Sequence, residues 1–365
     1  MNYIALKDVC TINMCQSPES SSYNEIGDGI PFFQGNADFG ERYPITRVWC
    51  NKPTKVAKAE DILISVRAPI GAMNYAKEKC CIGRGVAALT PNEEKVSSEF
   101  IFWLLKGKNN ELNQKGTGST FKAIGRKVLE EIQVPEINLE LQRKYASNLE
   151  RIYSIIQDRQ RQLEQLDKLV RARFVEMFGD PVSNSYGLPE ATLPELGKFG
   201  RGVSKHRPRN DPRLLDGEYP LVQTGDVANA SLYITSYNST YSELGLKQSK
   251  MWSKGTLCIT IAANIAKTAI LEFDACFPDS VVGFIANEKT NNIFIHYWFS
   301  FFQAILESQA PESAQKNINL KILSELKVIV PEKEKQNEFV DFVHQVDKSK
   351  LQYHPHTHTC QPNTS

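Results

Sequence analysis

The chain has 365 residues, enough for two or three domains, and its 41% hydrophobic content is ordinary for a globular protein. The 43 lysines and arginines nearly balance 42 acidic residues, which gives a net charge of +1. This balance excludes a uniformly basic protein that coats nucleic acid, so any contact with nucleic acid must come from local clusters of basic residues. No basic segment followed by an apolar one begins the chain, and no apolar run is long enough to span a membrane. The eight cysteines lack zinc-site spacing, so we expect a cytoplasmic protein with reduced thiols.

A long, diverged repeat relates the two halves of the chain, at an offset of roughly 190 residues. The matched segments are 4–9 with 191–196, 30–34 with 219–223, 61–66 with 256–261, 81–82 with 276–277, 86–89 with 281–284, 100–103 with 294–297, 122–124 with 316–318, and Gln142 with Gln336. Because the pairs keep their order, we interpret the chain as two similar domains. The alternative is two β-rich domains that resemble each other only through common strand patterns.

Each half reads as a mostly β domain with a few helices. Short runs of β-branched and aromatic residues are broken by Gly, Pro, Asn and Asp, and the clearest strands are 61–66 and 256–261. One apolar helical stretch follows in each half, around 100–105 and 294–306. Each half then closes on a proline, at Pro135 and at Pro331.

The segment 141–178 predicts one long helix, because it contains neither Gly nor Pro. Its apolar or long side chains recur in alternating steps of four and three, the heptad seam of a coiled coil. The seam positions are Tyr145, Leu149, Ile152, Ile156, Arg159, Leu163, Leu166, Val170, Arg173 and Met177. Such a helix would be ~60 Å long, and we expect Gly179 and Pro181 to end it.

A second helix is predicted at 332–351, where Phe339, Phe342, Val343, Val346 and Lys350 lie near one face. A long helix with a one-sided apolar seam needs a partner. We therefore expect the two helices to pack antiparallel, each following one domain. The alternative is an isolated linker helix, which would leave both seams exposed.

The predicted fold class is α+β: two similar, mostly β domains joined by long antiparallel coiled-coil helices, with an internal pseudo-two-fold repeat. The expected boundaries are 1–137 for the first domain, 138–180 for the central helix and 181–331 for the second domain. The distal helix is expected at 332–352, and a polar, disordered tail at 353–365.

The segment 165–181, which ends in Arg173-Phe174-Val175-Glu176-Met177-Phe178-Gly179-Asp180-Pro181, resembles the central conserved region of type I restriction–modification specificity subunits. Segment 338–350 resembles the distal region of that family, and 119–124 and 314–318 resemble the short polar motif that ends each recognition domain. The resemblance covers nearly the whole chain. It departs near Leu351, where the distal helix of the family usually continues for several more turns.

The resemblance implies a non-catalytic DNA-specificity subunit, in which each target recognition domain reads one half of a split sequence in double-stranded DNA. It also implies that the helices fix the gap between half-sites and dock two modification (methyltransferase) subunits, after which restriction subunits join. S-adenosylmethionine, ATP and Mg are then expected on partner subunits only, with no cofactor or metal on this chain. The docking candidates are Leu149, Ile152, Ile156, Leu163, Leu166, Val170, Phe174, Phe339, Phe342 and Val346.

Two basic segments are the best candidates for DNA contact. Segment 106–127 holds six basic residues and one acid, and segment 201–213 holds five lysines and arginines and one acid. Cations bind phosphates, whereas polar side chains on base edges read sequence. For each residue the alternative is a solvated surface position. The candidates are Gln34, Asn36, Arg67, Arg84, Lys115, Thr117, Ser119, Lys122, Arg126, Arg201, Lys205, Arg207, Arg209, Gln223, Thr224, Gln315, Lys316 and Asn317.

Two rival functions remain open from the residues alone. An unrecognised DNA-modifying enzyme would need a catalytic or cofactor motif, and the sequence offers neither a nucleotide-binding loop nor an adenine-methyltransferase motif. The glycines of Gly83-Arg84-Gly85 stand without the rest of a dinucleotide motif. His354, His356 and His358 could bind a stray metal, but a disordered tail is the favoured interpretation. The second rival is a coiled-coil protein–protein scaffold without a DNA role.

Overall fold

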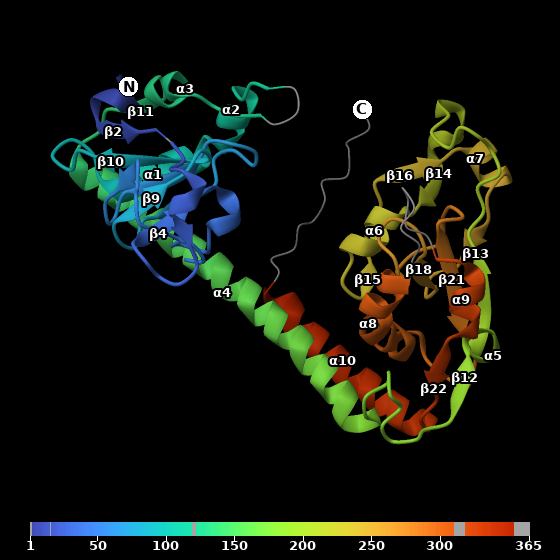
Figure 1. Cartoon of the computed structure of the whole chain (residues 1–365). Coiled ribbons are helices and arrows are strands. Elements are labelled where there is room, and N and C mark those ends of the chain that lie inside the picture. Colours follow the sequence, from blue (N-terminus) through green and yellow to red (C-terminus); the bar gives the residue numbers. More distant parts are fainter. Residues whose placement is uncertain (1, 15, 119–121, 310–317, 354–365) are drawn as a thin grey trace. The chain divides into compact units, whose positions relative to one another are not determined.

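The computed structural model describes residues 2–14, 16–118, 122–309 and 318–353. The chain divides into two compact units, Met1–Asp158 (unit 1) and Arg159–Ser365 (unit 2), and the division falls inside one long helix, α4 (Leu139–Phe178) (Figure 1). Each unit therefore includes one half of the helix that we expected between the domains. Within the described ranges, no helix is long and apolar enough to cross a membrane.

Unit 1 is built from three small sheets and several short helices. The strand orders are β1-β11, β2-β10-β7-β8 and β3-β5-β4-β9-β6. The strands are β1 (Tyr3–Ala5), β2 (Cys10–Asn13), β3 (Tyr23–Asn24), β4 (Ile30–Phe33), β5 (Trp49–Cys50), β6 (Val56–Ala57), β7 (Ile62–Ser65), β8 (Met73–Tyr75), β9 (Cys80–Ile82), β10 (Val86–Pro91) and β11 (Gln133–Pro135). The helices are α1 (Ser98–Gly107), α2 (Asn109–Gln114) and α3 (Arg126–Glu130), with short 3-10 turns at η1 (Leu6–Asp8), η2 (Ser20–Ser22) and η3 (Asn36–Asp38).

Strand β7 is buried on both faces, which shows how the layers of unit 1 are arranged. Its side chains alternate between two buried clusters, since Ile62 and Ile64 pack with α1 while Leu63 packs with Phe33 of the second sheet. The sheet β2-β10-β7-β8 is thus covered by a helix on one face and by a sheet on the other. A strand covered on both faces is hydrophobic at successive positions, which is why Ile62, Leu63 and Ile64 follow one another without a polar residue.

Unit 2 repeats this plan. Its strand orders are β12-β22, β13-β21-β18-β19-β15 and β16-β14-β20-β17. The strands are β12 (Glu190–Thr192), β13 (Gly197–Arg201), β14 (Leu215–Leu221), β15 (Tyr233–Ile234), β16 (Ser239–Tyr241), β17 (Met251–Trp252), β18 (Leu257–Thr260), β19 (Thr268–Leu271), β20 (Ala275–Cys276), β21 (Val281–Ala286) and β22 (Lys327–Ile329). The helices are α5 (Leu193–Leu196), α6 (Thr224–Asn229), α7 (Glu243–Lys247), α8 (Asn292–Gln309), α9 (Leu320–Glu325) and α10 (Lys333–Tyr353), with a 3-10 turn at η4 (Pro212–Leu214).

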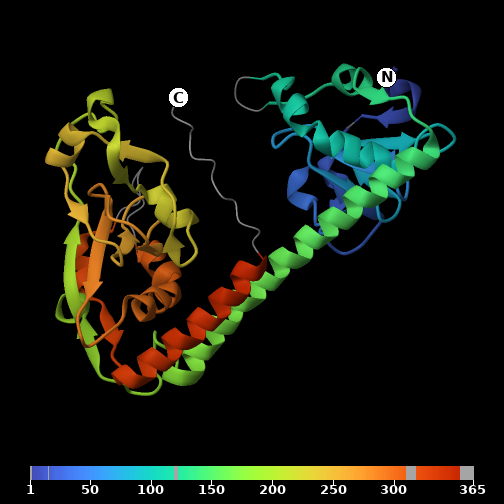
Figure 2. The ribbon, with the colours of Figure 1, turned by 180° about the vertical axis from the view of Figure 1, so that it is seen from behind.

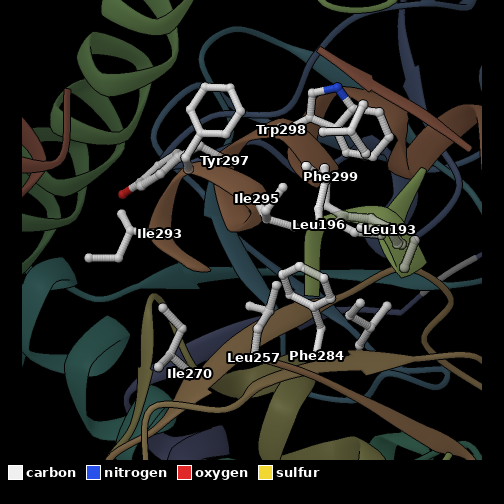
Figure 3. Close-up of a cluster of buried hydrophobic side chains, with 14 of the residues drawn as sticks. Leu193, Leu196, Leu257, Ile270, Phe284, Ile293, Ile295, Tyr297, Trp298 and Phe299 are labelled. Carbon is white, nitrogen blue, oxygen red and sulfur yellow. The ribbon is translucent and has the colours of Figure 1, made fainter. Parts of the chain in front are cut away.

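The main core of unit 2 lies between α8 and the sheet that contains β18. Figure 3 shows Ile295 of α8 above Leu257 of β18 and Phe284 of β21. The next residue of β18, Cys258, faces the other way and packs in a second cluster with Trp252. The two faces of β18 are therefore buried in the same way as those of β7.

The predicted repeat is confirmed by strand pairing. In unit 1, β7 pairs antiparallel with β10 and β8, while β4 and β9 run parallel. In unit 2, β18 pairs antiparallel with β21 and β19, while β14 and β20 run parallel. The segments matched in the sequence therefore occupy equivalent strands, and the likeness extends beyond a common strand pattern.

The predicted antiparallel helix pair is also confirmed, within unit 2. Figures 1 and 2 show α10 alongside the C-terminal half of α4. Near the start of α10, the ring centroid of Phe339 lies 5.3 Å from that of Phe174, and near its end Lys350 Nζ lies 2.6 Å from Asp167 Oδ1. The linker-helix alternative is therefore wrong for this half of α4.

Candidate nucleic-acid interface

Backbone hydrogen bonds bring four loops of unit 1 to one edge. Gly83 N–H donates to Phe33 O over 2.8 Å, and Val66 N–H donates to Gly85 O over 2.9 Å. Ile124 N–H in turn donates to Val66 O over 2.9 Å, and Ala68 N–H donates to Lys122 O over 3.0 Å. The loops that follow β4, β7 and β9 and the loop before α3 therefore meet. We call this surface the unit 1 edge, and it holds the candidates Gln34, Arg67, Arg84, Thr117 and Lys122.

The two glycines beside Arg84 are required by this close approach. A Cβ at Gly85 would lie 2.3 Å from Gln34 O, and one at Gly83 would lie 3.0 Å from the Phe32 ring. Only glycine lets the backbones approach this closely. The Gly83-Arg84-Gly85 segment, which is too short for a dinucleotide motif, is thus a turn that presents an arginine beside Gln34.

Three cations of the unit 1 edge are exposed. Within the described ranges, the side chains of Arg67, Arg84 and Lys122 have no hydrogen bond or ion pair. The backbone N–H of Gln34 donates to Asp38 Oδ2 over 2.7 Å, which fixes the 3-10 turn that carries the half-buried Asn36. Unpaired guanidinium and ammonium groups on one edge suit a phosphate backbone.

Two basic candidates of unit 1 have partners within the protein. Lys115 Nζ lies 2.6 Å from Glu111 Oε1, and hydrogen bonds from Lys115 and Lys108 lower the pKa of Glu111 to about 2. Arg126 donates from Nη2 to Ile12 O over 2.9 Å and pairs with Glu130. Arg126 therefore holds α3 against β2, and its contact with DNA stays a prediction.

Unit 2 assembles an equivalent edge from its own loops. Val222 N–H donates to Cys276 O over 2.9 Å, and Ile261 N–H donates to Ser280 O over 3.0 Å. Ile318 N–H donates to Ile261 O over 2.9 Å, as Ile124 does to Val66. We call this surface the unit 2 edge. Of the predicted contacts, Ser119, Gln315, Lys316 and Asn317 lie outside the described residues.

At one position of the unit 2 edge, an acidic residue replaces the basic residue of the unit 1 edge. Asp279 follows β20 where Arg84 follows β9, and the basic segment after β13 packs beside it. Arg207 Nη2 lies 3.4 Å from Asp279 Oδ2, and Arg209 forms an ion pair with Asp279 Oδ1. Sequence reasoning selected the two arginines but missed Asp279. Alignment of the repeat at Arg84 could have identified it.

The remaining candidates of unit 2 are in mixed environments. Arg201 at the end of β13 and Lys205 are exposed. Gln223 Nε2 donates to Ser239 Oγ over 3.1 Å, and its backbone N–H, just before Thr224 begins α6, donates to Asp226 Oδ2 over 2.8 Å. The exposed positions remain available to a ligand.

A neighbouring acid orders the basic loop of unit 2. Asp211 Oδ2 lies 2.7 Å from Arg213 Nη2 and 2.9 Å from His206 Nε2. The hydrogen bonds from Arg213 and His206 hold the pKa of the Asp211 carboxyl well below its usual range. This acid remains charged near neutral pH and restrains the loop.

The predicted docking residues divide by burial. Leu149, Ile152 and Ile156 are exposed, and Leu163, Leu166 and Phe342 are half-buried. The four residues Val170, Phe174, Phe339 and Val346 are buried in the core of unit 2. These four hold the helix pair together, so they offer no surface to another chain, and their predicted docking role is wrong.

The described residues offer little for catalysis. In the ranges that the structure describes, no group of three or more His, Cys, Asp or Glu side chains could hold a metal ion. Burial raises the pKa of the Cys10 and Cys80 thiols to about 12, so neither is a nucleophile near neutral pH.

This chain is similar in sequence to known proteins. A family model described as the type I restriction modification DNA specificity domain matches residues 1–166 and 190–356. The putative type I restriction enzyme MjaX specificity subunit of Methanocaldococcus jannaschii is 47% identical over 157 residues, covering 43% of this chain and 37% of the relative. The EcoBI specificity subunit of Escherichia coli is 21% identical over 379 residues, covering 94% and 78%.

A solved structure is similar over almost the full length. The type I restriction–modification S subunit from M. genitalium superposes with a TM-score of 0.59 at 16% identity, covering 96% of this chain and 90% of that one, which shows a shared fold. The matches to two M. jannaschii relatives, the MjaX and MjaIX subunits, span only 37% and 28% of those proteins. Since the family model matches both halves of the chain, the protein belongs to the family of the type I restriction modification DNA specificity domain.

Proposed function

We propose that this chain is the non-catalytic specificity subunit of a type I restriction–modification complex. It binds double-stranded DNA in the cytoplasm, and each unit reads one half of a bipartite target. The observation that carries this proposal is the repeated edge, which the two units build from the same loops and fill with different side chains. Arg84 stands where Asp279 stands in the other unit, and Arg67 stands where Ala262 stands. Two domains that recognise different half-sites need the same backbone framework and different contacting side chains.

The long helix has two roles in this proposal. α4 is continuous from Leu139 to Phe178, so it fixes the spacing between the half-sites. Its exposed and half-buried apolar residues, together with Phe342, dock two modification (methyltransferase) subunits, and restriction subunits join the complex. S-adenosylmethionine, ATP and Mg act on those partner subunits, and this chain requires none of them.

The first experiment is to co-express the chain with a type I modification subunit from the same source and to map methylated adenines across the host genome. A split methylated motif that disappears when the chain is omitted supports the proposal. Stable complexes without methylation point to segment 353–365, where the chain departs from the family. Absence of any complex, together with no sequence-dependent retention on DNA, favours the scaffold alternative.

A domain exchange tests the division of labour. Replacing 205–317 with the corresponding segment of a relative is expected to change one half of the methylated motif and to leave the other half and the gap intact. The matched exchange in unit 1, of 16–123, is expected to change the opposite half. A change of both halves after either exchange contradicts the proposal that each unit reads one half.

A further inference from the structure

A pocket of about 280 Å³ lies within unit 2, between the pair of helices α4 and α10 and helix α8. Its walls come from the C-terminal half of α4, from α10, from the middle of α8 and from the start of β19. It is lined by three cations, Arg171, Lys267 and Lys350, and by one acid, Asp167. We call this cavity the basic pocket.

Large side chains pack together at the equivalent place of unit 1. The rings of Tyr75 and Phe102 are stacked with their centroids 4.7 Å apart, and the Arg42 guanidinium lies 5.1 Å from the Tyr75 centroid. Lys106 Nζ lies 5.7 Å from the centroid of Phe102 and 3.7 Å from that of Tyr153. These five side chains form one aromatic and cationic cluster between β8, α1 and α4.

The repeat replaces every member of this cluster in unit 2. The equivalence follows from the paired strands β7–β8 and β18–β19, from the backbone hydrogen bonds of β8 and β19, and from counting along α8 and α10. The replacements are Leu232 for Arg42, Ile270 for Tyr75, His296 for Phe102, Ser300 for Lys106 and Asp347 for Tyr153. The exchange removes three six-membered rings and two long cationic side chains, and Leu232, His296 and Ser300 line the basic pocket in their place.

Two cations of the basic pocket are not paired with an acid. Lys350 Nζ is already paired, since it lies 2.6 Å from Asp167 Oδ1 and 3.4 Å from Asp347 Oδ1. Arg171 donates to a backbone oxygen over 3.4 Å, and in the ranges that the structure describes no ion pair involves Arg171 or Lys267. These two positive charges lie on different elements, so an oxyanion in the pocket can pair with both.

Neutral hydrogen-bonding groups line the more buried part of the basic pocket. Thr268 Oγ1 lies 3.0 Å from His296 Nδ1, which leaves the second ring nitrogen, Nε2, for a ligand. Burial and, after it, the charge of Lys350 lower the pKa of His296 to about 4. The imidazole is therefore neutral near pH 7, and it adds hydrogen-bonding capacity without adding a charge.

We infer that the basic pocket binds a small molecule that carries a phosphate group. Arg171 and Lys267 pair with its charge, and His296 Nε2 forms a hydrogen bond with one of its oxygens. A phosphate suits the site better than a carboxylate, because its three acceptor oxygens can meet groups from α4, β19 and α8 at once. The volume lies just below the range of drug-sized ligands, ~300–1,000 Å³, which suits a molecule of the size of glycerol 3-phosphate. This inference goes beyond the proposed function and involves neither DNA nor a partner subunit.

The phosphates of duplex DNA have the same chemistry but are attached to a much larger body. Thr268 and Tyr297, which line the basic pocket, are only 9% and 7% exposed, so a ligand must enter the pocket to reach them. A duplex carries its phosphates on a double helix that is far wider than a cavity of about 280 Å³. A free small molecule is therefore the better fit.

Calorimetric titration of the full chain with glycerol 3-phosphate, in a buffer without phosphate, tests the basic pocket. We expect saturable binding that weakens at least ~10-fold in Lys267→Ala and in Arg171→Gln, because each variant loses one cation. Arg171 is exposed and Lys267 is half-buried, so both variants are expected to fold. Lys267→Arg keeps the charge and should bind almost as tightly as the unaltered chain.

The matched control is Lys327→Ala, which removes an exposed lysine of β22 outside the basic pocket. It should leave the affinity for glycerol 3-phosphate unchanged. Absence of saturable binding to the unaltered chain overturns the inference. An equal loss of affinity in Lys327→Ala and Lys267→Ala overturns it as well, because the anion would then respond to the general charge of unit 2.

Two variants fill the basic pocket and leave its two unpaired cations in place. Thr268→Met introduces the residue that unit 1 has at the equivalent place, Met73, and His296→Phe introduces the equivalent of Phe102. Both should bind glycerol 3-phosphate at least ~10-fold more weakly, because the larger side chains take up the space and remove hydrogen-bonding groups. Hydrogen exchange of β18 and β21 shows whether each variant is folded. Undiminished binding in a folded variant places the anion on the outer surface and overturns the inference.

Competition with a short DNA duplex distinguishes the two sources of a phosphate group. An excess of duplex is expected to leave glycerol 3-phosphate bound to the full chain. Displacement by the duplex would assign the basic pocket to the DNA backbone and overturn the inference. The titrations themselves contain no DNA, so the proposed function can fail while the pocket binds its ligand, and the pocket can fail while DNA binding stands.

Discussion

Gln142 and Gln336 donate from Nε2 to equivalent pairs of carbonyl oxygens in the two units. Gln142 bonds Ile137 O at 2.8 Å and Lys95 O at 3.3 Å, and Gln336 bonds Pro331 O at 2.8 Å and Lys289 O at 3.0 Å. Both side chains are almost completely buried. Each glutamine therefore connects the start of its helix to the loop before α1 or α8, and the same polar contact recurs in the two units.

Replacing either glutamine with alanine is expected to destabilise only its own unit. Gln142→Ala removes the donor to two partly buried carbonyls and the acceptor of the buried Ser97 N–H, which costs ~1–3 kcal/mol. Hydrogen exchange should show faster opening of unit 1 in Gln142→Ala and of unit 2 in Gln336→Ala. The control Gln160→Ala removes an exposed glutamine of the same helix and should change neither unit. If one substitution reduced the protection from hydrogen exchange in both units, this would contradict the expectation that each glutamine stabilises only its own unit.

The fold could be predicted well where the signal is local. The predicted strands 61–66 and 256–261 contain β7 and β18, and the absence of Gly and Pro predicted α4 to within two residues of its start. The seam of α4 predicted which face is apolar, but it could not predict where that face is covered. Coverage depends on the antiparallel partner, and α10 lies against only the C-terminal half of α4.

Arg67→Ala and Arg84→Ala are expected to weaken DNA binding by unit 1. If each arginine binds a phosphate, each substitution should lower the slope of log K against log salt by about one and weaken all sequences alike. If an arginine binds a base edge, the loss should be ~1–3 kcal/mol and confined to one position of the half-site. Binding to a duplex carrying the mapped target, measured across salt concentrations, separates these outcomes.

Lys95→Ala is the matched control for this pair. Lys95 is exposed but lies beyond the far end of β10 from Arg84, ~20 Å away for a strand of this length. Its removal should leave the salt slope unchanged. An equal effect of Lys95→Ala and Arg84→Ala would show that general charge, and not the unit 1 edge, determines binding.

Asp279→Asn is expected to reduce the selectivity of unit 2. The carboxylate pairs with Arg207 and Arg209, so its loss removes a negative charge from the edge and the ion pair of Arg209, while Arg207 keeps its hydrogen bonds to Ser204 O and His206 O. Binding to non-target DNA should strengthen a few-fold, and one half of the motif selected from a random duplex pool should become less defined. Asp274→Asn, an exposed acid before β20, is the control. A sharper motif in Asp279→Asn would contradict this positioning role.

The ion pairs of Asp279 show why the candidate site was harder to predict than the fold. The basic residues of 201–213 mark a cationic segment, but the sequence does not say which cations are paired. Acidic side chains or carbonyl oxygens bind Arg126, Lys115 and Arg209, and they approach from other segments or from a neighbouring helical turn. The turn that carries the exposed Arg84 packs against Gln34 because the residues on either side of Arg84 are glycines. These contacts arise from tertiary packing, which a charge count cannot resolve.

The stability of unit 2 is expected to fall with acid through His296. This imidazole lines a pocket of about 280 Å³ and hydrogen bonds Thr268, and burial, together with Lys350, lowers its pKa from 6.5 to about 4. Between these two values the unfolded chain binds a proton that the folded chain does not, so lowering the pH favours unfolding. The contribution is complete above pH 6.5 and is lost as the pH falls toward 4.

His296→Phe tests this prediction, because Phe102 occupies the equivalent position of α1 in unit 1. Its free energy of unfolding, measured by denaturant titration at a series of pH values, should fall less with acid than that of the unaltered chain. The difference in slope should amount to on the order of 2 kcal/mol across the interval from pH 6.5 to 4. His344→Gln, an exposed histidine of α10, should keep the full dependence. Carboxylates titrate in the same interval in all three proteins, so the comparison between variants isolates the effect of the imidazole. If the free energies of unfolding of His296→Phe and of the unaltered chain fall in parallel with pH, the acid sensitivity comes from the carboxylates alone.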